Sequence, residues 1–417
     1  MKHVILGNGP AGVIAAETIR KHAPADEITV VGAESGPPYS RMAIPYLLMG
    51  RIAEDGTHLR KVPGHFADAR IAMRPGRARS VDTEAHTVAL DDGTVLPFDR
   101  LLIATGATPV RPPIPGFDLP CVRACWTLDD ARSIMTHTGP GARVLQIGAG
   151  FIGCIIMEAL VARGVQLSVV EMADRMVPRM MGAGAGEMIR RWVEAKQVAV
   201  FTDTRVEAIE AAEPYVARLS NGTRVAVDFV ISATGVQPNI DFLAGSGIKC
   251  DRGVLTDARM QTSVASIYAA GDCAEAFDVL SGAPVVSAIQ PNAADQGSCA
   301  GLNMAGRNVQ LQGVTQINVL DTLGLVSSSF GQWEGVPGGT FVELADGDQH
   351  RYLRLEFDGD VLVGSNAVGL TDHVGMLRGL THSRVHLGVW KDVLLREPLR
   401  LPEAYLASAQ AQHVRAH

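Results

Sequence analysis

Residues 1–34 read MKHVILGNGPAGVIAAETIRKHAPADEITVVGAE, and the order of residue types in this stretch decides the fold. Five features follow one another: an apolar run (4–6), a glycine-rich turn (7–12), a run without Gly or Pro (13–21), a second apolar run (28–31) and Glu34. A lone Gly-x-Gly-x-x-Gly would also fit an ordinary loop between a strand and a helix. Here the flanking strands, the helix and the distal acid accompany it, which predicts a dinucleotide-binding unit.

The glycines and Glu34 have separate physical roles in such a unit. Gly7 permits a tight turn, Gly9 lets the backbone approach a pyrophosphate, and Gly12 lets the helix pack closely on the strand. The N-terminus of the helix directs free N–H groups and a partial positive charge towards the phosphates. Glu34 lies where a carboxylate accepts hydrogen bonds from ribose hydroxyls.

Composition and charge set limits on the rest of the chain. With 417 residues, of which 47% are apolar, two or three globular domains are expected. The net charge of −7 argues against nucleic acid or an anionic membrane surface as the main partner. No apolar run is long enough to span a membrane, and residues 7–9 interrupt the first one, unlike a secretory signal. Six scattered cysteines without a C-x-x-C pair favour a reducing compartment, so we expect the cytoplasm.

The same pattern starts again in the middle of the chain. An apolar run (144–147), the turn Gly148-Ala149-Gly150-Phe151-Ile152-Gly153, a helix-like run (154–163), a second apolar run (167–170) and Glu171 follow one another. Residues 90–106 and 219–235 also share Leu, Gly-Thr, Asp and Ala-Thr-Gly at a constant offset, 129 positions from Leu90 to Leu219 and from Gly106 to Gly235. Two related dinucleotide-binding units are therefore expected.

Four motifs combine in this chain: Gly7-x-Gly9-x-x-Gly12 with Glu34, Ala104-Thr105-Gly106, Gly148-x-Gly150-x-x-Gly153 with Glu171, and Tyr268-Ala269-x-Gly271-Asp272. Together they resemble the FAD-dependent pyridine nucleotide-disulphide oxidoreductase superfamily. Residues 38–41 (Pro-Tyr-Ser-Arg) and 291–296 (Pro-Asn-Ala-x-x-Gln) resemble, within it, the ferredoxin and rubredoxin reductases and the flavin domain of assimilatory nitrite reductase.

The resemblance implies an α/β fold with two Rossmann-like domains and two cofactors. An FAD-binding domain (1–112 and 245–312) would be interrupted by an NAD-binding domain (113–244), and a small α+β domain (313–417) would follow. The implied FAD residues are Gly7, Gly9, Pro10, Ala11, Gly12, Glu34, Arg41, Ala78, Ala104, Thr105, Gly106, Gly271, Asp272, Gln290 and Pro291, with Asp272 on the ribityl chain. The implied pyridine-nucleotide residues are Gly148, Gly150, Phe151, Ile152, Gly153, Glu171 and Gly235.

The resemblance also implies a reaction. In the relatives a nicotinamide passes a hydride to flavin N5, and the reduced flavin releases electrons to an acceptor, while the protein supplies position and electrostatics. Glu171 favours NADH, because a carboxylate at the end of this strand repels the 2′-phosphate of NADPH. Arg175 lies nearby, so we expect NADPH to be used less rather than excluded.

Three positions depart from the patterns of the relatives. Met42 stands where peroxidase-type relatives carry their cysteine, and the C-x-x-x-x-C of the disulphide reductases is missing, so no thiol relay is expected. Tyr46 takes the place of a lysine near the flavin of oxygenase-type ferredoxin reductases. Ile155 takes the place of a glutamate beside the nicotinamide, and Glu158, one helical turn further on, is the candidate replacement. Tyr46 and Glu158 are thus the catalytic candidates, although Glu158 also fits a plain helix-surface glutamate.

We expect an FAD-dependent NADH oxidoreductase that passes electrons to a small redox protein or redox domain, such as a rubredoxin or ferredoxin. One alternative is a cysteine-free NADH oxidase or diaphorase that acts on oxygen, quinones or small molecules. Another is a flavin-binding subunit with weak turnover, in which Tyr46 and Ile155 mark lost reductase function. A homodimer is a further expectation, because the C-terminal domain of relatives often forms dimer contacts.

Two pairs of side chains invite other chemistry. Cys121 and Cys125 could form a redox pair, but their spacing is not C-x-x-C and two ordinary thiols are favoured. His382 and His386 are four residues apart and could face one metal ion from a helix, but no third ligand accompanies them. We therefore expect no metal site.

Overall fold

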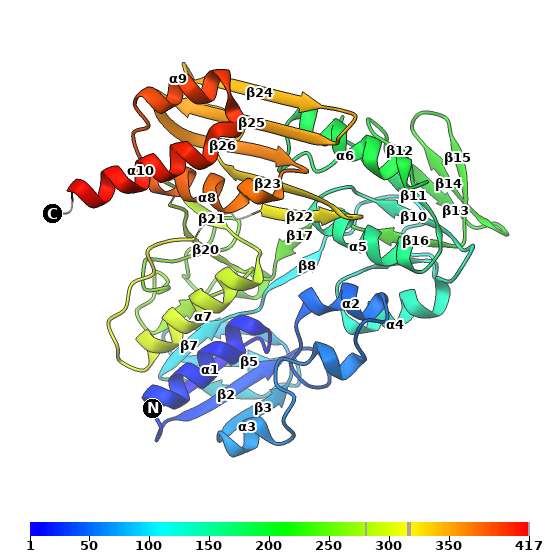
Figure 1. Cartoon of the computed structure of the whole chain (residues 1–417). Coiled ribbons are helices and arrows are strands. Elements are labelled where there is room, and N and C mark those ends of the chain that lie inside the picture. Colours follow the sequence, from blue (N-terminus) through cyan, green and yellow to red (C-terminus); the bar gives the residue numbers. More distant parts are fainter. Residues whose placement is uncertain (280–281, 315–317, 416–417) are drawn as a thin grey trace. The chain divides into compact units, whose positions relative to one another are not determined.

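The chain forms two compact units, each built on a parallel sheet (Figure 1). The computed structural model describes residues 1–279, 282–314 and 318–415. The first unit comprises residues 1–109 and 236–315, and the second comprises residues 110–235 and 316–417. The predicted α/β fold with Rossmann-like domains and a C-terminal sheet domain is confirmed.

The parallel sheet of the first unit has the strand order β19-β7-β1-β2-β3. Four of its strands, β1, β2, β7 and β19, are short and mostly buried, as expected for a parallel sheet covered on both faces, whereas the edge strand β3 is largely exposed. In the register, Leu6 at the end of β1 pairs with Val31 on one side and with Ile103 on the other. The chain leaves β1 towards β2 but returns on the opposite side through β7, so the strand order reverses at the carboxyl end of β1. The strands are β1 (Lys2–Leu6), β2 (Glu27–Gly32), β3 (Ile71–Pro75), β7 (Arg100–Ile103) and β19 (Ile267–Ala269).

Two helices, α1 (Pro10–His22) and α7 (Gln290–Met304), pack side by side in this unit (Figure 1). Gly297 and Gly301 of α7 face the backbone of α1. A Cβ at Gly297 would overlap the carbonyl oxygen of Ala11, and one at Gly301 would lie 2.8 Å from the carbonyl oxygen of Ala15. The two helices therefore approach more closely than side chains would allow.

Smaller elements complete the first unit. An antiparallel sheet β4-β5-β6 contributes Val81, Val88 and Leu90 to the core of the parallel sheet. The remaining elements are α2 (Ile44–Leu48), α3 (His65–Asp68), β4 (Ala78–Asp82), β5 (Thr87–Leu90), β6 (Val95–Pro97), β8 (Ala107–Pro109), β17 (Val236–Pro238), β18 (Val254–Leu255), β20 (Ala274–Phe277) and β21 (Pro284–Val286).

The second unit repeats the architecture of the first. Its parallel sheet has the order β12-β11-β10-β16-β9, and it reverses at β10 as the first sheet does at β1. Ile147 at the end of β10 pairs with Val170 and with Ser232. An antiparallel sheet β13-β14-β15 packs on the same core. The elements are β9 (Val122–Ala124), α4 (Leu128–His137), β10 (Arg143–Ile147), α5 (Phe151–Ala162), β11 (Gln166–Val170), α6 (Ala183–Ala195), β12 (Ala199–Phe201), β13 (Val206–Glu210), β14 (Tyr215–Leu219), β15 (Arg224–Val227) and β16 (Phe229–Ser232).

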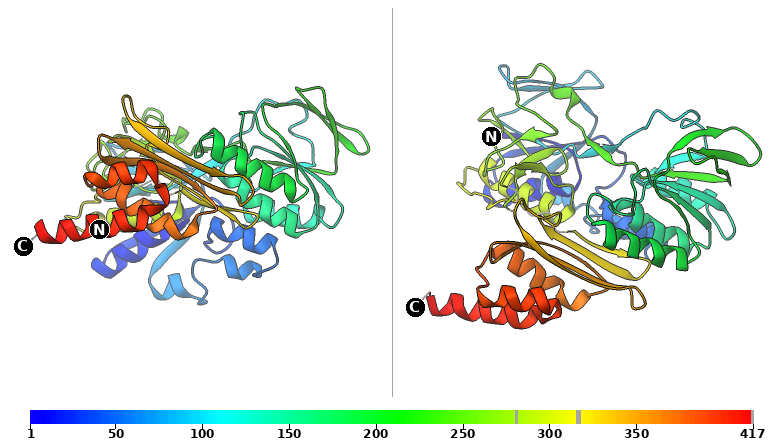
Figure 2. Two further views of the ribbon diagram at one scale, coloured as in Figure 1. Left: turned by 45° about the horizontal axis from the view of Figure 1, so that its top comes forward. Right: turned by 90° about the horizontal axis from the view of Figure 1, so that it is seen from above.

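The C-terminal part of the second unit is an antiparallel sheet of order β22-β23-β26-β25-β24. Helices α8, α9 and α10 cover one of its faces (Figure 2). The residues Tyr352 and Asn366, on β25 and β26, contact the start of α6. The elements are β22 (Asn318–Thr322), β23 (Leu325–Gly331), β24 (Thr340–Asp346), β25 (Arg351–Asp358), β26 (Val361–Val368), α8 (Val374–Ser383), α9 (Val389–Arg396) and α10 (Leu401–Arg415).

Most differences from the expected elements occur at their ends. Helices α1 and α5 begin three residues earlier than the runs 13–21 and 154–163 indicate, because proline and glycine fit the first helical turn. Strand β19 (Ile267–Ala269) ends before Gly271, which adopts a left-handed φ of 81°. The division into three domains stays a prediction, because the C-terminal sheet belongs to the same compact unit as the second parallel sheet.

The contact between α1 and α7 leads to a stability prediction. Gly297→Ala should destabilise the protein by about 1–3 kcal/mol, because its Cβ forces the two helices apart. Gly375→Ala in α8 is the control, since open space surrounds its Cβ position and alanine is the better helix former. Thermal melting of both variants measures the difference. Equal melting temperatures of the Gly297→Ala and Gly375→Ala variants would show that the close approach of α1 and α7 does not matter for stability.

Candidate functional site

The glycine-rich turn after β1 touches the turn after β7. Gly7 has a φ of 116°, and a Cβ at this position would overlap the carbonyl oxygen of Ala104. A Cβ at Gly12, in the first turn of α1, would overlap the carbonyl oxygen of Gly7. Only glycine fits at these two positions, so the strand ends, the turn and the helix can meet at one edge of the sheet.

Gly9 differs from its two neighbours in the motif. No atom of the described residues lies within 4 Å of a Cβ built at Gly9. Gly9 is also the N-cap of α1, and no described side chain accepts a hydrogen bond from the first amides of the helix. The N-terminus of α1 thus faces open space with its backbone donors available, which is the arrangement that a pyrophosphate requires. The residues present therefore fit a bound dinucleotide.

Glu34, two residues beyond β2, is held by the loop that follows it. The Tyr39 hydroxyl donates to Glu34 Oε2 at 2.5 Å, and Arg41 Nη2 donates to Oε1 at 2.7 Å. Burial raises the pKa of the half-buried Asp272 carboxyl, and the positive charge of Arg41 opposes this shift. The Arg41 charge therefore acts on two of the predicted FAD residues, while Tyr39 is a contact residue that the sequence analysis missed.

The N-terminus of α7 joins the same edge. A Cβ at Gly271 would lie 3.2 Å from Ala11 Cβ, and the Gly271 amide donates to Gln296 Oε1 at 2.7 Å. Gln296 is fully buried, and its Nε2 has no hydrogen-bond partner within the described ranges. Ser40 Oγ donates to Gln290 Oε1 at 2.5 Å, which ties the Arg41 loop to this helix. The structure thus brings Gly271, Asp272 and Gln290 to the edge that carries the glycine-rich turn.

The Ala104-Thr105-Gly106 turn is held by Asn239, which the sequence analysis missed. Asn239 Nδ2 donates to Thr105 O at 2.9 Å, and Thr105 Oγ1 donates to Asn239 O at 2.8 Å. The backbone N–H of Asn239 donates to Gly106 O at 2.9 Å. Asn239 directly follows β17, which pairs with β8, and the Pro238-Asn239 step is the sequence signal that could have identified this contact.

The second unit has the same arrangement. Gly148 has a φ of 99°, and a Cβ there would overlap the carbonyl oxygen of Ala233. A Cβ at Gly153 would lie 2.5 Å from Gly148 O, whereas no described atom lies within 4 Å of a Cβ at Gly150. The turn is therefore closed at its first and third glycines and open at the second, as in the first unit.

Glu171 follows β11 directly and is bonded to backbone amides. Its Oε2 accepts from Ala149 N at 2.8 Å, and its Oε1 accepts from Ala173 N at 2.9 Å. One carboxylate thus connects the glycine-rich turn to the loop after β11. Both oxygens retain further lone pairs for ribose hydroxyls.

The catalytic candidates Tyr46 and Glu158 lie on α2 and α5, respectively. Tyr46 on α2 is 49% exposed, and Met42 just before this helix is 51% exposed. Glu158 lies half-buried on α5, one turn beyond Ile155. Ala78 begins β4, and Gly235 follows β16 with a φ of 102°. Their assignments to catalysis and cofactor binding stay predictions.

The six cysteines are all unpaired, and only Cys250 is exposed. Burial raises the pKa of the Cys125 and Cys154 thiols to about 12. Burial also raises the pKa of Cys121, Cys250, Cys273 and Cys299. Since the thiolate is the reactive form, none of these side chains has the low pKa of a redox-active thiol.

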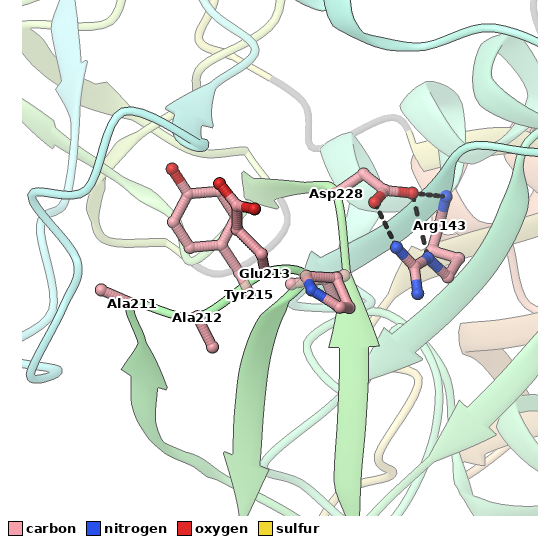
Figure 3. A pocket seen from close by; sticks show the side chains of 8 residues that line it. Arg143, Ala211, Ala212, Glu213, Tyr215 and Asp228 are labelled. Atoms are coloured by element: carbon pink, nitrogen blue, oxygen red, sulfur yellow. Dashed lines mark hydrogen bonds and ion pairs between the residues drawn. The ribbon is translucent and has the colours of Figure 1, made fainter.

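A surface depression of about 650 Å³ lies in the second unit (Figure 3). It is lined by the Arg143–Asp228 ion pair and by residues 211–215, between β13 and β14. None of the predicted cofactor or catalytic residues contributes to it. The depression is shallow and open to solvent, unlike a cofactor-binding cleft.

His382 and His386 do not lie on one helix face. Helix α8 ends at Ser383, and Arg384 adopts a left-handed φ of 48°. His386 Nδ1 instead lies 2.6 Å from Asp360 Oδ1. Within residues 1–279, 282–314 and 318–415, no three His, Cys, Asp or Glu side chains are grouped so that they could hold a metal ion.

None of the described helices is both long enough and apolar enough to cross a membrane.

The chain matches the family model for pyridine nucleotide-disulphide oxidoreductases over residues 1–297. It belongs to this family. It is therefore an NAD(P)H-dependent FAD oxidoreductase.

Three relatives show where the chain lies within the pyridine nucleotide-disulphide oxidoreductases. Subunit epsilon of the NADH-dependent phenylglyoxylate dehydrogenase of Aromatoleum evansii is 33% identical over 363 residues, or 86% of either chain. The NADH oxidase of Methanocaldococcus jannaschii is 33% identical over 73% of this chain and 70% of its own. Rhodocoxin reductase of Rhodococcus erythropolis is 31% identical over 75% of this chain and 74% of its own. The covalent putidaredoxin reductase–putidaredoxin complex has the same fold, with a TM-score of 0.89 at 23% identity over 98% of this chain and 99% of that chain.

Gly9 provides a test of the first site. Gly9→Val should reduce bound FAD to less than about a tenth of one per chain, because the side chain occupies the open space beside the amides of α1. Gly139→Val is the control, since Gly139 has equally open surroundings but lies in a loop of the second unit. Flavin absorbance after desalting measures the cofactor. A Gly9→Val protein with a full complement of FAD would show that the site is misplaced.

The buried thiols lead to a second test. Cys121→Ser, Cys125→Ser, Cys273→Ser and Cys299→Ser should each keep NADH-to-dye electron transfer within about tenfold of the parent, because no thiolate takes part. Reductive titration should show two electrons per flavin. A hundredfold loss in a variant that retains FAD, or the uptake of four electrons, would instead reveal a thiol step.

Proposed function

We propose that this enzyme passes electrons from NADH, through FAD, to a small redox protein such as a rubredoxin or a ferredoxin. The observation that carries the proposal is the pair of glycine-rich turns, each open only at its middle glycine, in a chain with five of its six thiols buried and with the pKa of all six raised by burial. Two dinucleotide sites without a reactive thiol suit direct electron flow from nicotinamide to flavin to an external acceptor.

The first unit would hold FAD through its backbone and three polar side chains. The amides at the start of α1 would bind the pyrophosphate, and Glu34, fixed by Tyr39 and Arg41, would bind the ribose. Asp272 and the unpartnered Nε2 of Gln296 would provide polar contacts beside the N-terminus of α7. FAD, when bound, supplies hydride acceptance and the release of electrons one or two at a time.

The second unit would hold NADH in preference to NADPH. Glu171 accepts hydrogen bonds from Ala149 and Ala173, so its charge is fixed at the end of β11. A fixed carboxylate there repels a 2′-phosphate. The positive charge of Arg175 could offset this repulsion, but its Nη1 lies 3.1 Å from Asp174 Oδ2. Asp174 therefore partly neutralises the charge of Arg175 that would favour NADPH.

The similarity to rhodocoxin reductase supports a protein acceptor. The similarity to subunit epsilon of phenylglyoxylate dehydrogenase extends the proposal to a redox domain of another subunit. The similarity to an NADH oxidase favours oxygen as the second candidate acceptor. Assembly as a homodimer and residence in the cytoplasm stay predictions.

Anaerobic rapid mixing separates these functions. NADH should bleach the flavin within milliseconds to seconds, and reoxidation by an added rubredoxin or ferredoxin should be at least tenfold faster than reoxidation by air-saturated buffer. Faster reoxidation by oxygen would favour the oxidase. A flavin that NADH does not bleach would favour the flavin-binding subunit and refute the reductase.

The prediction on nucleotide choice concerns Glu171. The parent enzyme should prefer NADH over NADPH by at least tenfold in kcat/KM, and Glu171→Ala with Met172→Arg should reduce that ratio at least tenfold. Met172 is 69% exposed, so an arginine fits there without repacking. Glu171→Ala alone is the control for the two lost amide contacts. Equal rates with both nucleotides in the parent would rule out this role.

A further inference from the structure

Asn366, on the C-terminal strand β26, reaches the loop that follows Glu171. Its side chain is fully buried. Gly182 N donates to Asn366 Oδ1 at 2.8 Å, and Asn366 Nδ2 donates to Met180 O at 3.0 Å. Gly182 is the N-cap of α6. One amide side chain therefore holds both the last part of the loop and the start of the helix.

The loop that Asn366 holds is bonded at its centre to the glycine-rich turn. Val177 N donates to Ala149 O at 2.8 Å, and the Met180 and Met181 amides both donate to Val177 O at 2.9 Å. Val177, Met180 and Met181 are all buried. Val177 adopts a left-handed φ of 52°, which is unfavourable for a β-branched residue and requires support from its surroundings.

Ala149 connects this loop to Glu171. Its carbonyl accepts from Val177, and its amide donates to Glu171 Oε2. Hydrogen bonds thus run without interruption from Asn366 through Met180, Val177 and Ala149 to the carboxylate. Loss of the first link would free the loop and loosen the orientation of Glu171, since Val177 and Ala149 each take part in two successive hydrogen bonds of this path.

A second contact between α6 and the C-terminal sheet lies far from this loop. Trp192 Nε1 donates to Thr322 O and Leu323 O, both at 3.1 Å. Trp192 is ten residues beyond Gly182, which corresponds to about 15 Å along a helix. Trp192 therefore contributes to the general packing of α6 against the C-terminal sheet. A variant at Trp192 can thus distinguish this general packing from the specific contact made by Asn366.

We propose that Asn366 is a positioning residue for the pyridine nucleotide, through which the C-terminal domain holds the loop that orients Glu171. This inference rests on the proposed function of Glu171 as the ribose ligand. It gives the C-terminal sheet a part in nucleotide affinity although none of its residues belongs to the glycine-rich turn.

Asn366→Leu removes both hydrogen bonds at similar volume. The Kd for NADH, taken from the concentration dependence of flavin bleaching, should rise roughly tenfold, the effect of losing a buried hydrogen-bonded pair. The limiting bleaching rate and the FAD content should stay within about twofold of the wild type. Hydrogen exchange of residues 172–182, measured without nucleotide, should become at least tenfold faster. Asn366→Ser, which is smaller and polar but too short for both partners, provides a second variant if the leucine protein does not fold.

Two controls accompany these variants. Trp192→Phe should lower the melting temperature but leave the Kd for NADH within about twofold, and Ser365→Ala, the neighbouring buried position on β26, should change neither. An unchanged Kd and unchanged exchange in both Asn366 variants, or an equal rise of the Kd in Trp192→Phe, would overturn the inference. A wild-type flavin that NADH does not bleach would overturn the proposed function instead.

Discussion

Close packing of backbone against backbone at two strand ends is the constraint on which the rest of the structure depends. In the first unit Gly7 leaves no room for a side chain beside the Ala104 carbonyl, and in the second Gly148 does the same beside Ala233. Both contacts lie where the strand order reverses, so the turns after two parallel strands must share one edge of the sheet. The start of the following helix is brought to the same edge, and the middle glycine is left facing open space.

The first unit adds a second helix to this edge by the same means. Glycines 297 and 301 let α7 lie against the backbone of α1, and Gly271 fits between Ala11 and Ala293. Two helix N-termini and Asp272 therefore lie at one edge of the sheet, the edge to which we assign the diphosphate and sugar chain of FAD in the proposed function. The positive charge of Arg41 and the Nε2 of Gln296, which is buried without a partner among the described residues, suit a polar ligand.

Amide side chains connect segments that are remote in the sequence. Asn239 holds the Ala104-Thr105-Gly106 turn from more than one hundred residues away, and Asn366 holds the loop after Glu171 from the last sheet of the chain. An asparagine suits this purpose because its amide donates and accepts at once and so satisfies both an N–H and a C=O of a buried loop. By contrast the cysteines, which carry the chemistry in disulphide-using relatives, are here buried in five of six cases, and burial raises the pKa of their thiols. The chain thus uses polar side chains to hold loops in place.

The sequence by itself determined the two glycine-rich units, their acids Glu34 and Glu171, and the strands and helices that flank the two turns. These features depend on local geometry: a glycine where the backbone must turn, an apolar run where a strand is buried, and an acid one to three residues after the second run. The tertiary structure alone decided which remote residues support them. Tyr39 on Glu34, Asn239 on Thr105 and Asn366 on Met180 give no periodic signal, because each depends on a single side chain that arrives from another element. His382 and His386 show that a local pattern can also mislead. Their spacing of four suggests one helix face, but α8 ends between them, where Arg384 adopts a left-handed φ. Local patterns predict local structure, whereas a contact between distant segments is specified only by the packing that brings them together.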